Sequence, residues 1–213
     1  MLKTLSNIPL PAFIRRLGFL MLLSVSFIFC SSVAIVTEAK LEYTINRNGS
    51  QIGTLHFTKM TQGDKTLLKM RSTVKFRILA LITANAIEDA VFDKDVMIWS
   101  SVYREINGHE KSNKNTKINT NNYLLINGKK TEPFPHYPIK YNMLCVYLVE
   151  PVNKTQIYSD NYQCMLNITT LGPHHYKIVL PNGDYNEYHY KNGICEMVDV
   201  HSTLYHSTIV LKK

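Results

Sequence analysis

The stretch PNGDYNEYHYKNG occupies residues 181–193 and holds two Asn-Gly dipeptides, Asn182-Gly183 and Asn192-Gly193. Asn and Gly tolerate a positive φ angle, which the tight turns of β-hairpins require. Between the dipeptides lies one aromatic segment in which side-chain character alternates. The stretch therefore predicts two chain reversals on either side of a single antiparallel strand.

The same dipeptide recurs at Asn48-Gly49, Asn107-Gly108 and Asn127-Gly128, between runs rich in Val, Ile, Thr, Tyr and Phe. Residues 68–78 show the clearest alternation of the chain, with apolar side chains on one face and Lys or Arg on the other. A strand of this kind has one dry and one solvated face, which is typical of antiparallel sheets. The sequence thus predicts an antiparallel meander.

We count about a dozen such strands, more than a flat open sheet holds comfortably, and we expect the sheet to curl into a barrel or half-barrel. The predicted fold class is mainly β. Residues 141–149 are the one helix candidate, because Leu144, Tyr147 and Leu148 have helical spacing, Asn142 can cap the start and Pro151 ends the run. A continuous apolar run of this length is equally typical of a central strand.

Residues 1–39 have the features of a secretory signal peptide. Basic residues precede the apolar run 17–29, and small residues at Ala34 and Ala39 offer two cleavage positions. An uncleaved N-terminal anchor is the alternative, since residues 17–36 are long enough to cross a bilayer. Residues 40–213 are expected to form a single β-rich domain, and the protein is expected to be exported to the periplasm or outer envelope.

The net charge is +8 for the whole chain, and removal of residues 1–39 (three basic side chains and one acidic) leaves +6. The basic residues are dispersed rather than concentrated in a stripe with interleaved aromatics, as nucleic-acid binding would require. We therefore expect no nucleic-acid partner, and membrane contact only through the N-terminal segment.

Three cysteines lie beyond residue 39, so at most one disulfide can form. Cys164 and Cys195 are the candidate pair, because both follow polar stretches while Cys145 lies within an apolar run. Three buried thiols that behave as small hydrophobic residues are the alternative.

The chain as a whole resembles a family of exported bacterial proteins known only as a domain of unknown function. The resemblance rests on turn and core motifs: YTI-x-x-NG-x-x-IG from residue 43, YL-x-EP from residue 147, HY-x-x-x-LPNG from residue 175, and N-x-Y-x-Y-x-NG from residue 186. It implies a shared fold, similar to the antiparallel half-barrels of envelope lipoprotein carriers. Because these are turn and core residues, it implies no catalytic residues.

No catalytic, metal-binding or cofactor-binding signature stands out in the sequence. Five histidines gather in the last forty residues (His174, His175, His189, His201 and His206), but with neither HxH nor HExxH spacing. Asp199 and His201 share a strand face and are too few for a metal site. We therefore expect a protein that is not an enzyme and that needs no cofactor or metal.

The leading functional hypothesis is an envelope protein whose curved sheet binds an apolar ligand or an apolar segment of a partner. Met143, Leu144, Tyr147 and Trp99 are the candidate ligand-binding residues. The alternative is a structural or interaction subunit of the envelope with a filled core. It would dock through the polar arm of residues 109–117 or the cationic face of residues 69–77.

Overall fold

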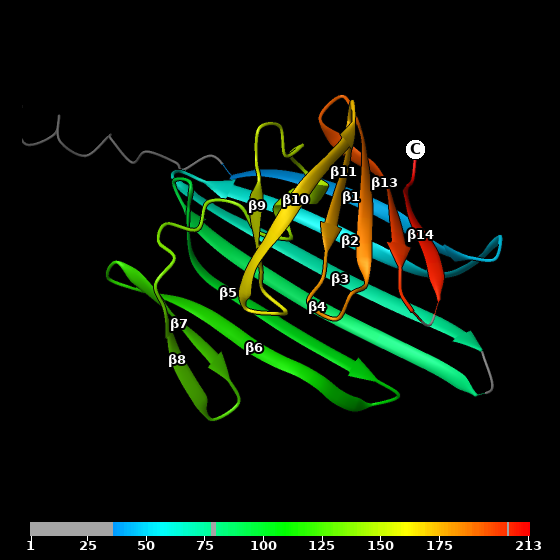
Figure 1. Cartoon of the computed structure of the whole chain (residues 1–213), viewed down its shortest axis with the longest axis horizontal. Helices are drawn as coiled ribbons and strands as arrows, with labels where there is room; N and C mark the ends of the chain where they lie inside the picture. The colour runs from blue at the N-terminus through cyan, green and yellow to red at the C-terminus, as the bar shows by residue number, and fades with distance from the viewer. Residues whose placement is uncertain (1–35, 78–79, 204) are drawn as a thin grey trace, which may run out of the picture. The chain divides into compact units, whose positions relative to one another are not determined.

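The computed structural model describes residues 36–77, 80–203 and 205–213, and Val36–Lys213 forms one compact unit. This unit is a 14-stranded antiparallel sheet (Figure 1). The strands are β1 (Val36–Arg47), β2 (Ser50–Gln62), β3 (Lys65–Arg77), β4 (Leu81–Asp93), β5 (Val96–Ile106), β6 (His109–Asn119), β7 (Asn122–Asn127), β8 (Lys130–Phe134), β9 (Gln156–Ser159), β10 (Cys164–Gly172), β11 (His175–Val179), β12 (Tyr185–Lys191), β13 (Ile194–His201) and β14 (His206–Leu211). The predicted mainly-β, antiparallel fold is confirmed.

Each strand pairs with the strands before and after it in sequence, except that β8 and β9 do not pair with each other. In addition, the first strand, β1, pairs with the last strand, β14. Tyr43 of β1 lies opposite Leu211 of β14, so the first and last strands meet in the middle of the sheet. The sheet is consequently open, with β8 and β9 at its two edges. A closed barrel is not formed.

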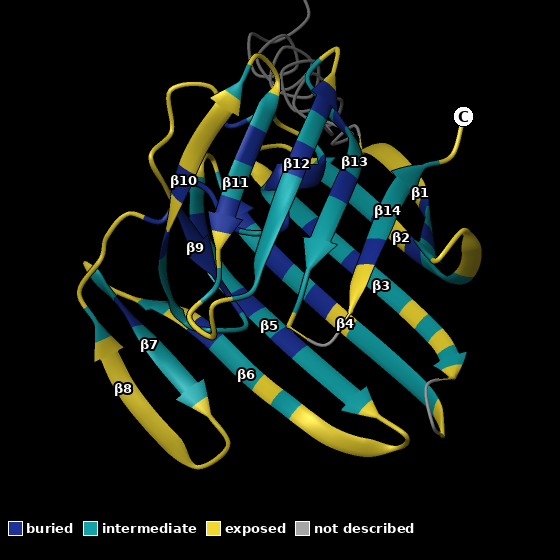
Figure 2. Cartoon of the chain, turned by 45° about the vertical axis from the view of Figure 1, so that its right-hand side comes forward, coloured by how far each residue is buried: buried dark blue, intermediate teal, exposed yellow. Residues whose placement is uncertain are grey.

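The short strands β9–β14 cross over one face of the long strands β2–β6 (Figure 1). Buried residues lie toward the start of β3 and of β5 and toward the end of β4, in the part of the sheet that the short strands cross (Figure 2). A buried hydrogen bond of 2.8 Å joins the Thr116 hydroxyl of β6 to the Tyr158 hydroxyl of β9. The sheet thus folds back on itself, and the core lies between its two halves.

All five Asn-Gly dipeptides are at hairpin turns, as predicted. At Asn48-Gly49, Asn107-Gly108 and Asn192-Gly193 both residues have positive φ. Gly183 has a φ of +88° and Gly193 one of +79°. The turn at Gly183 is closed by its own amide, which donates to the Leu180 carbonyl at 3.0 Å. These turns set the register of β11, β12 and β13.

Replacement of Gly183 by Val is expected to lower the free energy of unfolding by about 1–3 kcal/mol, because a β-branched residue strongly resists positive φ. Gly172→Val is the matched control. An added Cβ meets no atom within 4 Å at either position, and only Gly183 has a positive φ. Urea denaturation of both variants checks the prediction. Equal stability losses would show that backbone conformation at the turn is not the cause.

Strand β3 shows the predicted alternation. Leu68 and Met70 are buried, while Lys75 and Arg77 on the opposite face are exposed. Arg71 on the solvated face pairs with Asp89 of β4 at 2.7 Å. Ile78, the last apolar residue of the predicted pattern, lies outside the described residues.

The predicted helix at residues 141–149 is wrong. Only Cys145–Tyr147 adopts helical geometry, as a single 3-10 turn. Asn142 does accept a hydrogen bond from the Cys145 amide at 3.3 Å, as a cap would, but its backbone also bridges to Tyr158. The run is too short to form a stable α-helix alone. Its side chains are apolar on nearly every side, so contacts with the surrounding strands determine its backbone conformation. We call residues 141–149 the inner segment.

The inner segment fills the concave face of the sheet. The ring of Tyr147 lies 5.4 Å from that of Tyr43 and 5.8 Å from that of Phe57, centroid to centroid. The Tyr190 hydroxyl donates to the Val146 carbonyl at 2.8 Å. The interior of the folded sheet is therefore occupied largely by the chain itself.

Strand β1 begins at Val36, before the predicted domain boundary at residue 40. Residues 36–39 pair in register with residues 59–62 of β2. Cleavage after Ala34 would leave β1 whole, whereas cleavage after Ala39 would remove its first four residues. The rest of the predicted signal segment lies outside the described residues. Within the described ranges, no helix has the length and apolar character needed to cross a membrane.

Candidate functional site

A cavity of about 130 Å³ remains between the two halves of the sheet, beside the inner segment; we call it the lumen pocket. Three of the four predicted ligand-binding residues, Met143, Leu144 and Tyr147, line it. Trp99 does not. Trp99 lies on β5, where it pairs with Val91 of β4 and Lys117 of β6, and it is only half-buried. The remaining lining residues are Met70, Glu88, Arg104, Ser159, Asn161, Tyr162, Leu180, Asn186 and Tyr188.

The polar centre of the lumen pocket is an ion pair between Glu88 of β4 and Arg104 of β5. Glu88 is 3% exposed, and its Oε1 accepts hydrogen bonds from Nε of Arg104 at 3.1 Å and from Nη2. Burial works against the charge of Arg104, but Glu88 outweighs it and raises the pKa of the guanidinium. No sequence pattern indicates this ion pair, because the two side chains meet only through the pairing of β4 with β5.

Arg104 keeps unused hydrogen-bonding capacity. Its side chain lies inside the folded sheet, yet 43% of its surface is accessible because it lines the pocket. Nη1 makes no hydrogen bond to any residue in the described part of the chain. A guanidinium has five N–H donors, so Arg104 has donors left for a group that enters the pocket. The pocket therefore combines an apolar wall with a hydrogen-bond donor.

A second buried polar group lies behind the inner segment. Asp160 is 3% exposed, and its Oδ2 accepts from Asn142 Nδ2 at 3.0 Å, while its Oδ1 has no hydrogen-bond partner of normal geometry among the described residues. Burial raises the pKa of Asp160 to about 7, against the lowering influence of the Ser100 hydroxyl beside it. Near neutral pH this carboxyl is poised between its two protonation states.

We expect stability to fall as pH rises from about 4 to about 7. In that window the unfolded chain has already lost the Asp160 proton while the folded protein retains it, so the unfolding free energy decreases with pH. Asp160→Asn should remove this decrease and raise the unfolding free energy at pH 8 by about 1–3 kcal/mol. Urea denaturation between pH 4 and 8 measures it, with the exposed turn residue Asp64→Asn as control. A slope unchanged in Asp160→Asn would contradict the assignment.

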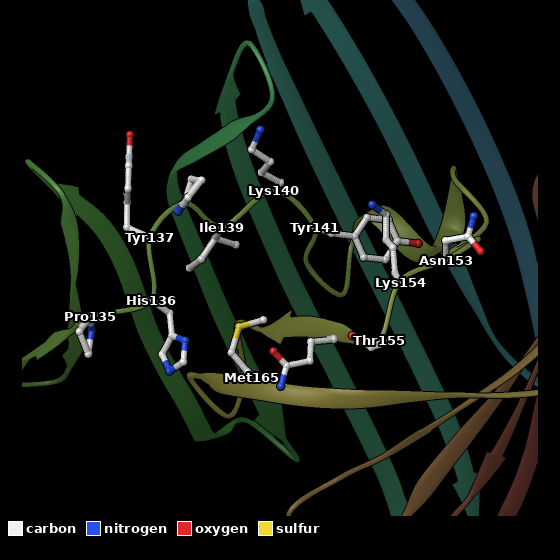
Figure 3. A pocket seen from close by; sticks show the side chains of 12 residues that line it. Pro135, His136, Tyr137, Ile139, Lys140, Tyr141, Asn153, Lys154, Thr155 and Met165 are labelled. Carbon is white, nitrogen blue, oxygen red and sulfur yellow. The ribbon is translucent and has the colours of Figure 1, made fainter.

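A second hollow, of about 540 Å³, lies on the surface (Figure 3). Its lining residues are 135–141, 153–156 and Met165. The two lysines that border it are engaged: Lys140 pairs with Asp95 at 2.7 Å, and Lys154 lies 5.0 Å above the Tyr141 ring. No pattern in the sequence indicated this hollow. Its polar groups do not converge on one point, so it is the weaker candidate.

The candidate disulfide is not formed. Cys164 lies on β10 and Cys195 on β13, with two strands between them, and both are free thiols, as is Cys145. Burial raises the pKa of Cys145 and of Cys195 to about 12. Thiols with such a pKa stay protonated at neutral pH and are poor nucleophiles. The alternative interpretation, three buried thiols, holds in part: Cys195 is buried in the core, while Cys145 and Cys164 are half-buried and pack against it.

The chain belongs to the family described as Domain of unknown function (DUF6134), whose family model matches residues 43–212. The predicted membership of a family of unknown function is thereby confirmed. The fold is similar to the crystal structure of a β-barrel-like protein of Domain of Unknown Function DUF1849 from Brucella abortus, with a TM-score of 0.54. That match covers 85% of this chain and 97% of the other, at 9% identity, and so it bears on the fold alone. No curated protein matches the chain.

Proposed function

We propose that the protein is a non-enzymatic, exported protein of the periplasm or outer envelope that binds an apolar ligand, or an apolar segment of a partner, in the lumen pocket. The observation that carries the proposal is the guanidinium of Arg104, which is held by Glu88 yet keeps free N–H donors beside the apolar side chains of Met70, Met143 and Leu144. Ligand pockets are characteristically apolar, with a few polar groups that fix orientation.

The charges in the pocket indicate which polar group of a ligand can bind there. Glu88 already neutralises Arg104, so a second carboxylate would meet the repulsion of Glu88. A neutral carbonyl group accepts hydrogen bonds from the free N–H donors without this cost. The ligand is therefore an apolar group that carries a carbonyl, such as an acyl ester or an apolar peptide segment.

The size of the pocket limits how much of the ligand enters. Drug-sized ligands occupy pockets of about 300–1,000 Å³, whereas the lumen pocket has about 130 Å³. One apolar side chain or the first carbons of an acyl chain fit that volume. Longer ligands require the inner segment to move.

The groups around the pocket support a binding role over catalysis. Burial raises the pKa of Tyr147 and of Tyr188, so both phenols stay protonated at neutral pH. The Ser159 hydroxyl accepts a hydrogen bond from the Tyr162 amide at 3.3 Å, which holds it in a local turn. The proposal that the protein is exported is based on the signal-like residues 1–39. We propose no cofactor and no nucleic-acid partner.

Native mass spectrometry of the full chain, purified from its own host, tests the proposal. We expect a co-purified apolar species of defined mass that is lost in Leu180→Trp, because the indole would occupy the pocket that Leu180 lines. Leu171→Trp, at an exposed position of β10, is the control and should retain it. A bare chain in all three samples would count heavily against ligand binding.

The second candidate function, an interaction subunit with a filled core, is favoured by the small volume of the lumen pocket. Docking through the polar arm cannot be tested by deleting residues 110–116. Thr116 is buried and its hydroxyl bonds to that of Tyr158, so the deletion would also disrupt the core. The exposed residues Glu110 and Lys111 can be changed instead. If a partner protein co-purifies with the native chain and is lost in Glu110→Lys/Lys111→Glu, the interaction subunit is the better account.

A further inference from the structure

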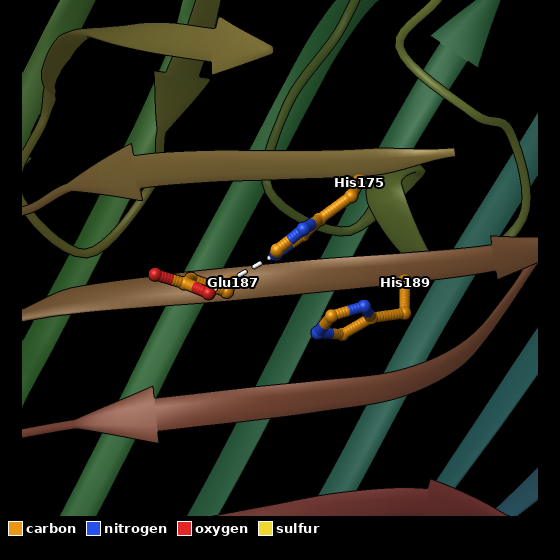
Figure 4. A group of neighbouring side chains, drawn as sticks. All are labelled: His175, Glu187 and His189. Carbon is orange, nitrogen blue, oxygen red and sulfur yellow. Dashed lines mark hydrogen bonds and ion pairs between the residues drawn. The ribbon is translucent and has the colours of Figure 1, made fainter. Parts of the chain in front are cut away.

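Three side chains on the outer face of the sheet form a cluster that the sequence did not predict: His175 of β11, and Glu187 and His189 of β12 (Figure 4). Their strand neighbours Tyr176 and Tyr188 are buried in the core. Because side chains alternate along a strand, the cluster points away from the core and from the lumen pocket.

The hairpin register brings the cluster together. His175 lies directly opposite His189, and the two rings stack with centroids 4.1 Å apart. Glu187, two residues before His189, shares its face, and its Oε2 lies 3.0 Å from Nε2 of His175. One ligand atom from each of the three residues lies within 4.8 Å of the other two.

We propose that His175, Glu187 and His189 bind a divalent transition-metal ion of the zinc class. Imidazole nitrogens and a carboxylate are a donor set that zinc uses in proteins, and two histidines with one carboxylate leave the fourth position for water. The same donors accept Ni²⁺ and Cu²⁺, which prefer imidazole as well. To bind a shared ion, each stacked ring must direct one of its nitrogens toward Glu187.

A carboxylate on the next strand supports the arrangement. Oδ2 of Asp199 on β13 lies 3.1 Å from Nε2 of His189. A carboxylate that accepts the second N–H of a histidine fixes the tautomer and orientation of the ring, which is the usual outer partner of a metal-binding imidazole. Asp199 therefore acts as a positioning residue and leaves the other nitrogen of His189 for the ion.

A lysine beside the cluster is engaged elsewhere. Lys177 lies opposite Glu187 in the β11–β12 register, where it could form an ion pair that competes with a metal. Its amine instead lies 3.5 Å above the ring of Tyr185. The ligand side chains are about one-fifth to one-third exposed, so an ion from solution can reach them. The three ligands lie on the paired strands β11 and β12 and Asp199 on β13, and sites on regular elements are more rigid than sites on loops.

Isothermal titration calorimetry tests the site with ZnCl₂ and NiCl₂ added to the full chain after treatment with EDTA. We expect saturable binding of one ion per chain. His189→Ala and the isosteric Glu187→Gln should abolish saturable binding. Asp199→Asn should weaken the affinity by about 10- to 100-fold, the range typical of a partner that orients a ligand.

His109→Ala, at an exposed position of β6, is the matched control and should bind as the parent does. Thermal melts without metal report whether each variant still folds, and Zn²⁺ should raise the melting temperature of the parent and not that of Glu187→Gln. Equal Zn²⁺ affinity in the parent and in Glu187→Gln, or no saturable binding in the parent, would overturn the proposal. Since the cluster and the lumen pocket lie on opposite faces, this result is independent of the proposed function.

Discussion

Replacement of Tyr147 by Ala is expected to lower the free energy of unfolding by about 3–5 kcal/mol. Tyr147 is 8% exposed and packs on Tyr43 of β1 and Phe57 of β2, two adjacent strands of the sheet. Removal of the ring leaves a cavity between the two halves of the sheet. The hydrogen bonds between neighbouring strands prevent the strands from moving together to close it. Urea denaturation followed by far-UV circular dichroism measures the loss.

Tyr137→Ala is the control for this prediction. Tyr137 is 43% exposed, so its removal should change the unfolding free energy by about 0.5 kcal/mol or less. Comparable losses in the two variants would show that the inner segment does not fill the concave face as described.

Arg104→Met is expected to destabilise the protein by about 3–5 kcal/mol at neutral pH, because it leaves the carboxylate of Glu88 buried without a counter-charge. The double variant Arg104→Met/Glu88→Gln should recover most of the loss, since the glutamine carries no charge. Lys140→Met is the control. Its partner Asp95 is exposed, and exposed ion pairs contribute about 0–1 kcal/mol.

The double variant decides the interpretation of Arg104→Met. If Glu88→Gln in the Arg104→Met background recovers nothing, the loss arises from the packing of the Arg104 side chain and not from an unpaired carboxylate. The description of the pocket as a neutralised ion pair would then be wrong.

Local sequence patterns predicted the fold because the information that defines a meander is itself local. The five Asn-Gly turns mark chain reversals through backbone preference alone, and alternation along residues 68–77 identifies the buried face. The pairing of β1 with β14 is different. It joins the two ends of the domain, and neither strand carries a signal for it.

The interior was predicted less well, because there tertiary contacts override local preference. Leu144, Tyr147 and Leu148 have helical spacing, but the bridge between Asn142 and Tyr158 and the demand for burial on all sides restrict the run to one 3-10 turn. Three ligand-binding candidates from this run do line the lumen pocket. Trp99 does not, because its place on β5 turns it away from the cavity.

Contacts across strands account for the rest of what sequence analysis missed. Glu88 and Arg104 are sixteen residues apart, and His175 and His189 are fourteen apart. Spacing rules such as HxH describe ligands on one strand or helix, whereas these pairs depend on the register between strands. That register can be read only once the turns and bulges of both strands are placed.

NMR of the full chain with ¹³C-labelled methionine methyl groups tests binding in the lumen pocket most directly. Met70 and Met143 line this pocket, while Met165 lines the surface hollow and so reports on the competing site. Titration with glycerol monooctanoate or with N-acetyl-leucine amide, both neutral carbonyl compounds, should shift the Met70 and Met143 methyl signals in a saturable manner. The Met165 signal should stay unchanged. Shifts confined to Met165, or no saturable shift with either compound, would contradict the account.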